Sequence, residues 1–386
     1  MTRRRFAVIG KGLFGSAAAR HLAEAGHEVV LVGPDEPTEP HAHAGVFASH
    51  HDAARITRVL DRDPLWAELA RASLARHGEL EAATGVQFHH RHPVLFAGSG
   101  VSDLTDAVFA TGALLQVDAD AAPAPPAGLD LPDDTRLACE TGDAGWIAPR
   151  RLVQAQTLAA LAAGAKVVRS PVWALRDAGP DGTRLILDDG SEIVAERVLI
   201  CAGAFAAPVG LVEGLPLWTE GRTVVLARVD EAHRDAVADL PCLLHHAPGA
   251  DLEDAYLLPP VRYPDGHDYV KLGSGSLARR FDELDALQDW FRGPAPMEDI
   301  ERLEAGLKRL VPALADAEMR TDQCALTLTA SGRPIIDWTI PGRVAVALGG
   351  NGKGAKSSDE IGRLGAALLT ESAGAAELAP FAASAR

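Results

Sequence analysis

The chain has 386 residues, of which 47% are hydrophobic and 23% charged, enough apolar material for the cores of about two domains. Its formal net charge of -16 excludes binding of nucleic acid or an anionic membrane through bulk electrostatics, so any anionic ligand must be held by local positive groups. Four widely spaced cysteines, Cys139, Cys201, Cys242 and Cys324, predict reduced thiols in a cytoplasmic protein, with neither a disulfide framework nor a metal site. Lys11 interrupts the apolar start and no apolar run is long enough to cross a bilayer, so we expect no signal peptide and no membrane segment.

The first predicted elements form a strand, a glycine-rich turn, a helix and a second strand. In such a unit the first glycine permits a tight turn, the second lets the backbone approach a pyrophosphate, and the third lets helix and strand pack closely. A bare GxGxxG also occurs in ordinary loops, but the flanking strand and helix favour a dinucleotide site. In chain order the unit comprises a strand at 5–9, a turn with Gly10, Gly12 and Gly15, a helix at 16–25 and a strand at 27–32.

The end of the second strand lacks the acidic residue that usually holds a ribose hydroxyl in this motif. Gly33 stands at that position. Asp35 and Glu36 are the nearby carboxylates that could replace it, and backbone groups are the alternative. This departure from the motif concerns the contacts to the AMP half of a dinucleotide.

A pair of arginines follows in SHHDAARITR, residues 49–58. Arg55 and Arg58 are three positions apart, so we expect them to lie on one face of a helix. Taken alone, the pattern favours a solvated basic face or an ion pair with Asp61 or Asp63.

Together with the glycine turn, this segment resembles the N-terminal region of the monomeric sarcosine oxidases, flavoprotein amine oxidases of the D-amino acid oxidase superfamily. In that family a Ser-His-His stretch precedes two arginines at the same spacing. The resemblance continues at 145–155, in a strand at 165–172 that carries a valine beside the adenine, and at 197–205, a buried strand that ends in a glycine turn. It implies bound FAD, contacted in these segments by Gly10, Gly12, Gly15, Ser49, His50, Arg55, Val172 and Gly203.

Cys324 lies in DQCALTLTASGRPIID, residues 322–337. The residues alone show a cysteine before an alternating apolar run, which is typical of a small buried side chain. In the family that the chain resembles, a cysteine twelve positions before an Ile-Asp pair is bonded through sulfur to the flavin, and Ile336 and Asp337 stand at that spacing. The resemblance therefore implies FAD attached covalently through Cys324.

A second glycine-rich loop follows a predicted strand in VAVALGGNGKGAK, residues 344–356. Its glycines would let backbone N–H groups reach a flavin ring or its phosphates, the alternative being a mobile surface turn. By resemblance, Gly350, Gly352, Gly354 and Lys356 form the second flavin-contacting loop. Lys356 would also bind a substrate carboxylate together with Arg58.

The resemblance assigns two further residues to the substrate site. Lys271 matches a lysine that helps oxygen react with reduced flavin by stabilising the developing charge, although its alternating context also fits an exposed strand residue. Tyr256 matches a pocket tyrosine. The family's pocket histidine and its other pocket tyrosine are replaced by Gly275 and Leu326, which implies a larger, less polar cavity and a substrate bulkier than sarcosine.

We therefore expect an α/β (α+β) fold in which a Rossmann-like FAD-binding domain is assembled from discontinuous segments. A second, substrate-binding domain would be built around a mixed, mainly antiparallel sheet with strands at 222–229 and 269–273 and a helix at 297–310. The expected boundaries are 1–88, 145–216 and 323–386 for the FAD domain, and 89–144 and 217–322 for the substrate domain.

The expected function is FAD-dependent oxidation of a secondary amine, or of an N-alkyl or cyclic amino acid, to an imine by a monomer, with O2 reduced to H2O2. The first alternative is a flavin-dependent amine dehydrogenase that uses another electron acceptor. An NAD-dependent dehydrogenase is disfavoured by the second glycine-rich loop and Cys324. A non-catalytic flavin-fold protein is the remaining alternative.

Overall fold

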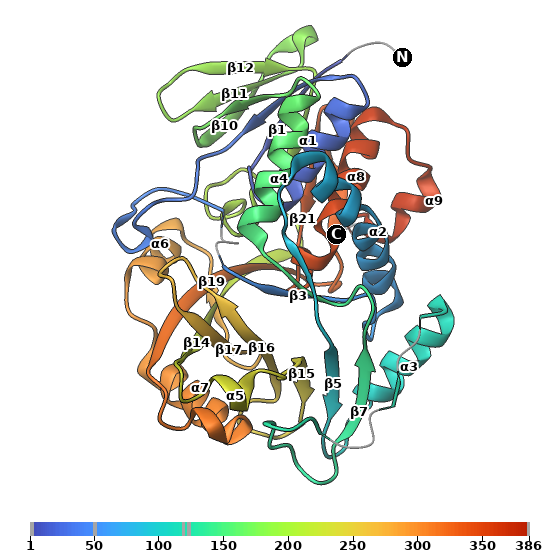
Figure 1. Cartoon of the computed structure of the whole chain (residues 1–386). Helices are drawn as coiled ribbons and strands as arrows, with labels where there is room; N and C mark the ends of the chain where they lie inside the picture. The colour runs from blue at the N-terminus through green and yellow to red at the C-terminus, as the bar shows by residue number, and fades with distance from the viewer. Residues whose placement is uncertain (1–3, 49–51, 118–119, 122–124, 384–386) are drawn as a thin grey trace.

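The computed structural model describes residues 4–48, 52–117, 120–121 and 125–383. Within these residues the strands form two large and two small sheets (Figure 1). A six-stranded, mostly parallel sheet lies in the half of the molecule that contains β1 and α1, and a nine-stranded, mostly antiparallel sheet forms the other half. This arrangement confirms the expected mixed α/β fold. No described helix is both long enough and apolar enough to cross a membrane.

Strands from distant parts of the chain build the six-stranded sheet. Its order is β20-β21-β13-β1-β2-β9, and all neighbours except β20 and β21 are parallel. Since parallel neighbours need long crossover connections, N-terminal, central and C-terminal segments meet in one Rossmann-like sheet, as predicted. The strands are β1 (Arg5–Ile9), β2 (Glu28–Val32), β9 (Lys166–Val168), β13 (Arg197–Ile200), β20 (Ile335–Ile340) and β21 (Val344–Leu348).

Side chains of β1 alternate between the two faces of this sheet. Phe6 and Val8 pack against helical residues, whereas Ala7 and Ile9 pack against a small three-stranded sheet that covers the other face. Burial on both faces explains why the strand is a continuous apolar run in the sequence. The covering strands are β10 (Val172–Asp177), β11 (Thr183–Leu187) and β12 (Glu192–Ala195).

Helices α1 and α8 pack closely on the first face of the six-stranded sheet, with α2 and α4 beside them (Figure 1). A Cβ atom on Gly362 would lie 2.5 Å from the Cβ of Ala17, so this close approach requires glycine. Asp63 caps α2 by accepting a hydrogen bond from the backbone N–H of Leu65 at 3.0 Å. The helices are α1 (Leu13–Glu24), α2 (Pro64–Thr84), α3 (Leu104–Leu115), α4 (Pro149–Ala162), α5 (Arg234–Val237), α6 (Leu284–Arg292), α7 (Met297–Leu310), α8 (Gly354–Thr370) and α9 (Ala375–Leu378).

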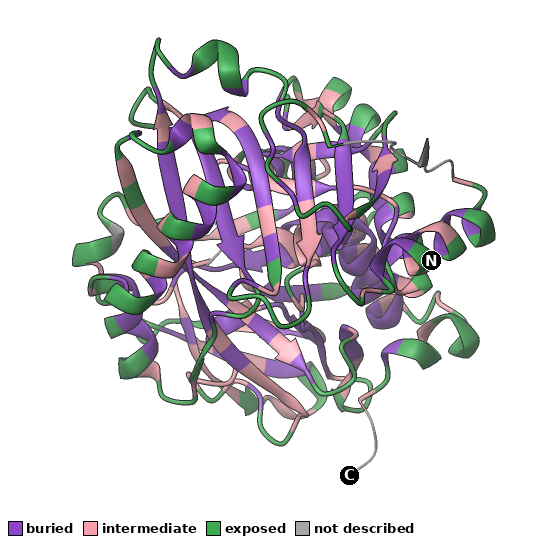
Figure 2. Ribbon diagram, turned by 90° about the horizontal axis from the view of Figure 1, so that it is seen from below, coloured by how far each residue is buried: buried purple, intermediate pink, exposed green. Residues whose placement is uncertain are grey.

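The nine-stranded sheet separates two hydrophobic cores, and most of its length is buried (Figure 2). Leucines of α7 pack on one face, while the other face carries Phe96, Leu244 and Tyr256. The predicted helix at 297–310 has the bounds of α7. The strands are β5 (Val94–Gly98), β6 (Asp120–Ala121), β7 (Arg136–Glu140), β14 (Leu217–Val229), β15 (Cys242–His246), β16 (Asp254–Arg262), β17 (Asp268–Ser274), β18 (Arg279–Phe281) and β19 (Met319–Thr329).

Strand β19 pairs with β14 along its whole length, with Cys324 opposite Arg222. The domain boundary predicted at residue 323 therefore falls inside a strand of the large sheet. The division of the chain into two domains stays a prediction.

The segment with the two arginines is not helical. Arg55 begins strand β3 (Arg55–Thr57), which pairs antiparallel with β8 (Gly145–Ile147), and Arg58 follows the strand. β8 also pairs with β4 (His89–Arg91) and completes the second small sheet. The expectation of a shared helical face was wrong, because pairing with a strand about ninety residues away determines the local structure.

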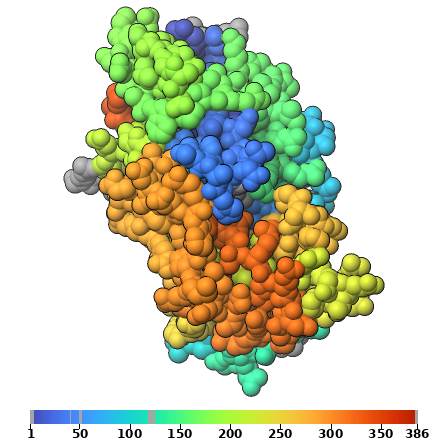
Figure 3. All heavy atoms as spheres, turned by 90° about the vertical axis from the view of Figure 1, so that its left-hand side faces the viewer, coloured from blue at the N-terminus to red at the C-terminus, as the bar shows by residue number. Residues whose placement is uncertain are grey.

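Residues after β2 lie across the surface between the two halves of the molecule and contact α6. Gln288 on α6 donates a hydrogen bond to the carbonyl of Ala44 at 2.7 Å, and the ring of Phe47 packs against Phe205 and Phe291. Figure 3 views this face, with the segment after β2 in blue beside residues near α6 in orange. Phe47 lines the cavity beneath, so the segment closes one side of it.

Candidate active site

The glycine turn after β1 lines a cavity of about 200 Å³. Gly10 has a φ of 103°, and a Cβ atom there would lie 2.4 Å from the carbonyl oxygen of Cys201. A Cβ on Gly15 would lie 1.8 Å from the carbonyl oxygen of Gly10. Helix α1 starts at this turn with Gly12 as its N-cap and no capping side chain, so its first N–H groups are available to an anion. The turn has the form that binding of a dinucleotide pyrophosphate requires.

The second glycine-rich loop lines the same cavity. Asn351 fixes this loop: its side-chain oxygen accepts a hydrogen bond from the backbone N–H of Thr329 at 2.9 Å, and its amide donates to the carbonyl of Gly349 at 2.7 Å. The sequence analysis did not single out Asn351. The other predicted cofactor residues that line this cavity are Arg55, Val172, Gly203, Gly350, Gly352 and Gly354.

At the end of β2 a side chain cannot be accommodated at position 33. A Cβ atom on Gly33 would lie 2.7 Å from the backbone nitrogen of Lys11. The two candidate carboxylates are used elsewhere, since Asp35 forms ion pairs with Lys11 and Arg169, and Glu36 pairs with Arg150. Lys11 itself lines the cavity, and Gly33 leaves this end of the site without the acidic side chain that the motif usually has there.

A second cavity of about 340 Å³ adjoins the first. Arg55, Leu326 and Asn351 are among the residues that line both. The face of the nine-stranded sheet that carries Phe96, Leu244 and Tyr256 lines this second cavity. Gly275 and Leu326, which stand where the resemblance places polar rings, both border this cavity, in agreement with a less polar pocket.

Arg58 and Lys356 line this second cavity and meet around a buried carboxylate. The Nζ atom of Lys356 donates to Asp61 at 2.9 Å, Lys353 donates to the same carboxylate at 2.5 Å, and Arg58 Nη2 lies 3.5 Å from it. Asp61 is 2% exposed and Lys356 1% exposed. Burial and the charge of Arg58 lower the pKa of Lys356 to about 7, although Asp61 opposes this shift. When Lys356 is protonated, the three cations outnumber the carboxylates of Asp61 and of Glu140, a buried residue that acts electrostatically on Arg58 and Lys356, so a positive surplus remains.

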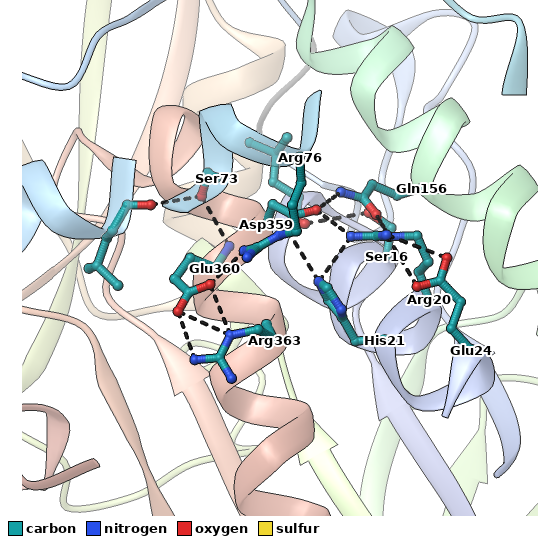
Figure 4. A network of polar contacts seen from close by, with 12 residues as sticks. Ser16, Arg20, His21, Glu24, Ser73, Arg76, Gln156, Asp359, Glu360 and Arg363 are labelled. Carbon is teal, nitrogen blue, oxygen red and sulfur yellow. Dashed lines mark hydrogen bonds and ion pairs between the residues drawn. The ribbon is translucent and has the colours of Figure 1, made fainter. Parts of the chain in front are cut away.

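Helix α8, which begins with this cluster, is held by a second ionic network (Figure 4). Asp359 is completely buried and binds Arg20 at 2.6 Å, His21 at 3.2 Å and Gln156 at 2.7 Å, and also pairs with Arg76. These partners come from α1, α2 and α4. The network therefore ties the helix of the first glycine turn to the helix of the second.

Cys324 lies where the two cavities meet. It lines the second cavity and acts electrostatically on Arg55, which lines both cavities. Tyr256 lines the same cavity and is coupled electrostatically to Cys324. Its phenol crosses Gly273, where a Cβ atom would be 2.4 Å from the hydroxyl oxygen. Burial and the neighbouring Cys324 raise the pKa of Tyr256, so the phenol stays protonated at neutral pH.

Lys271 is buried at the edge of this site and is not among the described residues that line either cavity. Its Nζ atom donates to Asp52 at 2.7 Å and to the carbonyl of Ala54 at 2.6 Å. Burial opposes ionisation of Asp52, but the charges of Lys271 and Arg55 outweigh it and hold the pKa of that carboxyl well below its usual range. The carboxyl of Asp52 is therefore ionised at neutral pH, while burial lowers the pKa of Lys271 against the opposing charge of Asp52.

The predicted site residues thus come together from distant segments, with some differences. Ser49 and His50 lie outside the described residues. Gly15 packs behind the glycine turn, and Lys271 lies behind the cavity walls. Among the charged and polar residues that the sequence did not assign to the site are Lys11, Asp52, Asp61, Arg222, Asn351 and Lys353.

Residues 5–368 match the protein family described as FAD dependent oxidoreductase. The chain belongs to this family. FAD is accordingly the cofactor of this family, and the match confirms the resemblance seen in the sequence. The glycine cradle and the uncapped start of α1 fit its pyrophosphate. No curated protein matches the chain closely enough to count as a relative.

Solved structures share the whole fold at low sequence identity. NikD, an unusual amino acid oxidase essential for nikkomycin biosynthesis, has a TM-score of 0.77 and 21% identity over 99% of this chain and 98% of its own. L-proline dehydrogenase from P. horikoshii has a TM-score of 0.78 and 17% identity over 98% and 96%. Iminodiacetate oxidase from Chelativorans sp. BNC1 has a TM-score of 0.72 and 21% identity over 98% and 99%. At such identities the similarity shows the fold alone.

Proposed function

We propose that the protein oxidises the C–N bond of an amino acid that is a secondary or cyclic amine bulkier than sarcosine, forming an imine. The observation that carries this proposal is the cationic cluster of Arg58 and Lys356 beside the cofactor cavity, in a protein whose overall charge is strongly negative. Such a cluster favours a substrate carboxylate. The NikD, L-proline dehydrogenase and iminodiacetate oxidase folds support an amino-acid or amine substrate.

Bound FAD would accept the hydride equivalent from the substrate, a reaction that no protein side chain performs. The residues of the chain bind and orient the substrate. Arg58 and Lys356 hold the carboxylate, and the apolar walls at Phe96 and Leu244 exclude water from the amine. Tyr256, protonated and close to Cys324, can donate a hydrogen bond at the edge of the cavity.

The first experiment is anaerobic mixing of the purified protein with N-methyl amino acids, cyclic imino acids and glycated amino acids. We expect at least one of them to bleach the absorbance of the bound flavin. Yellow protein that no amine bleaches would make the chain a non-catalytic flavin-fold protein. Colourless protein would instead revive the NAD-dependent alternative.

A second experiment identifies the electron acceptor. We propose O2, reduced to H2O2, so one peroxide should form per amine consumed in aerobic buffer. Since an L-proline dehydrogenase has the same fold, a dehydrogenase is the second candidate. It predicts substrate oxidation with little peroxide until an artificial acceptor is added.

Covalent attachment of FAD through Cys324 is a further part of the proposal. The position of Cys324, which lines the second cavity while the next residues of its strand line the first, supports it. Acid precipitation should leave yellow colour in the protein pellet, and digestion should place the flavin on the peptide that contains Cys324. Cys324→Ala should release FAD into the supernatant, whereas Cys139→Ala, at a half-buried cysteine that lines neither cavity, should not. Free release from the wild-type protein would show that Cys324 is only a core residue.

For Lys271 we propose a role in the reaction with oxygen. Lys271→Met keeps the length of the side chain and removes the charge, so reoxidation of reduced flavin should slow more than reduction by the amine. Stopped-flow absorbance measures the two half-reactions separately. Because Asp52 keeps Arg55 at 3.2 Å and Tyr263 at 2.9 Å as partners, we expect the variant to fold. Equal loss in both half-reactions would make Lys271 a residue that only supports the site.

A further inference from the structure

Asp61 occupies part of the anion site proposed above. Its carboxylate is 2% exposed, lines the second cavity and is contacted by Arg58, Lys353 and Lys356. One of its oxygens also accepts a hydrogen bond from the backbone N–H of Asp63 at 3.2 Å, which fixes it in place. A carboxylate of the protein itself therefore takes up donors that a ligand would otherwise use.

The donors that remain fit a single additional carboxylate. Lys356 Nζ carries three N–H groups and, within the described residues, donates one of them to Asp61. The Nε atom of Arg58 is buried and has no hydrogen-bond partner among those residues. Lys353, which is 27% exposed, is already paired with Asp61 at 2.5 Å. The free N–H groups of Lys356 therefore remain for a ligand carboxylate beside Asp61.

The other arginines that line the cavity already have carboxylate partners within the described residues. Arg222 lies 2.6 Å from Glu220, Arg55 lies 3.2 Å from Asp52, and Arg62 lies 3.7 Å from Asp254. The positive surplus is therefore concentrated around Asp61. A substitution that changes the charge at residue 61 should therefore change how many anionic groups of a ligand the cavity can bind.

We propose that Asp61 is a specificity-determining residue that restricts the substrate to one carboxylate. The inference rests on the proposed function, because it assumes that the cavity binds an amino acid. With Asp61 ionised, a dicarboxylate would bring its second negative charge close to a buried carboxylate of the protein, which opposes its binding. An amine with two carboxylates, such as iminodiacetate, should therefore be a poor ligand.

The test compares two carboxylates in which sulfur replaces the amine nitrogen, so that neither is the proposed substrate. Methylthioacetate has one carboxylate and thiodiacetate has two. Titration calorimetry on the flavin-containing protein, at a pH below the value of about 7 for Lys356, should show that the wild-type protein prefers methylthioacetate. Asp61→Asn, which has nearly the same shape, should shift the ratio of the two dissociation constants by about tenfold towards thiodiacetate.

Asp63→Asn is the matched control. It removes the same charge two positions away, does not line the cavity, and keeps a good N-cap for α2 because asparagine caps as well as aspartate. The ratio of the dissociation constants for methylthioacetate and thiodiacetate should be the same in Asp63→Asn as in the wild-type protein. If Asp61→Asn does not fold, Lys353→Met provides the second test, since it leaves Asp61 less neutralised and should weaken thiodiacetate more than methylthioacetate.

Equal binding of both probes to the wild-type protein, or an unchanged ratio in Asp61→Asn, would overturn the inference. Failure of the proposed function has a different signature. If the charge selectivity is present but none of the amines tested bleaches the flavin, the inference about Asp61 stands and the proposed oxidation is wrong.

Discussion

Asp359→Asn should destabilise the protein by about 3–5 kcal/mol, because it removes the charge that Arg20 and Arg76 share in the interior. Two buried or half-buried cations would then face a neutral amide. Urea unfolding followed by far-UV circular dichroism measures the change. At constant m-value, a lower midpoint reports the lost free energy of unfolding.

Glu24→Gln is the control for this substitution. Glu24 pairs with the same Arg20 at 3.2 Å, but its side chain is 44% exposed, so its loss should cost only about 0.5 kcal/mol. Equal effects of the two variants would show that the network in Figure 4 contributes no more than a surface ion pair.

The effect of Asp359→Asn should also depend on pH. Burial alone would raise the pKa of Asp359, but the hydrogen bond from His21 and the charge of Arg20 outweigh it and hold the pKa well below the usual range. A carboxyl whose pKa is lowered on folding stabilises the protein above its unfolded pKa of about 4 and loses this contribution as the pH falls. The difference between the wild-type protein and the variant should therefore shrink in acid.

Arg58→Ala should lower kcat/KM for a carboxylate-bearing amine roughly 10- to 100-fold, because the charge-assisted contacts to the carboxylate are lost. This corresponds to a loss of about 1.5–3 kcal/mol of transition-state stabilisation. Steady-state kinetics with the best amine of the panel measures the effect. The corresponding amide is the control substrate, since it has no carboxylate to lose. Equal losses with acid and amide, or none with either, would refute the carboxylate clamp.

Lys356 gives the clamp a pH dependence. With a pKa of about 7, its ammonium loses a proton as the pH rises through neutrality, so carboxylate binding should weaken above about pH 7. Calorimetric titration with methylthioacetate between pH 6 and 9 avoids the ionisation of a substrate amine, and a bound carboxylate should move the transition to higher pH. The Lys356→Met variant should bind methylthioacetate more weakly, and its affinity should change little between pH 6 and 9. A flat wild-type profile would contradict the role of Lys356.

Local patterns predicted the parts of the fold that depend on neighbouring residues. The strand, glycine turn, helix and strand at the N-terminus were predicted because Gly10 and Gly15 are each required by a close backbone approach. The periodicity of α7 gave its bounds. Arg55 was misassigned because its strand forms by pairing with β8, and such non-local pairing leaves no periodic signal in a three-residue segment.

The charges of the site show the same limitation. Asp61 was seen as a partner for Arg58 three residues away, but its role as the centre of a cluster depends on Lys353 and Lys356, almost 300 residues later. Likewise, the ammonium of Lys271 has a sequence context that fits an exposed strand, yet it is buried against Asp52. Sequence spacing identifies residue types, whereas their ion pairs arise only from the tertiary fold.

The order of strands in the six-stranded sheet has a consequence for how the protein is made. β1 is synthesised first, but its neighbour β13 comes almost 200 residues later, and β21, beyond β13, later still. While the chain emerges from the ribosome, the edge of β1 that later pairs with β13 has no partner strand. The carboxylate of Asp61 likewise has no ion pair with Lys356 until the C-terminal part of the chain has been made. Contacts between residues so far apart in the sequence make folding slow and produce intermediates that are prone to aggregation. Chaperones that shield the nascent N-terminal unit should therefore increase the yield of functional protein.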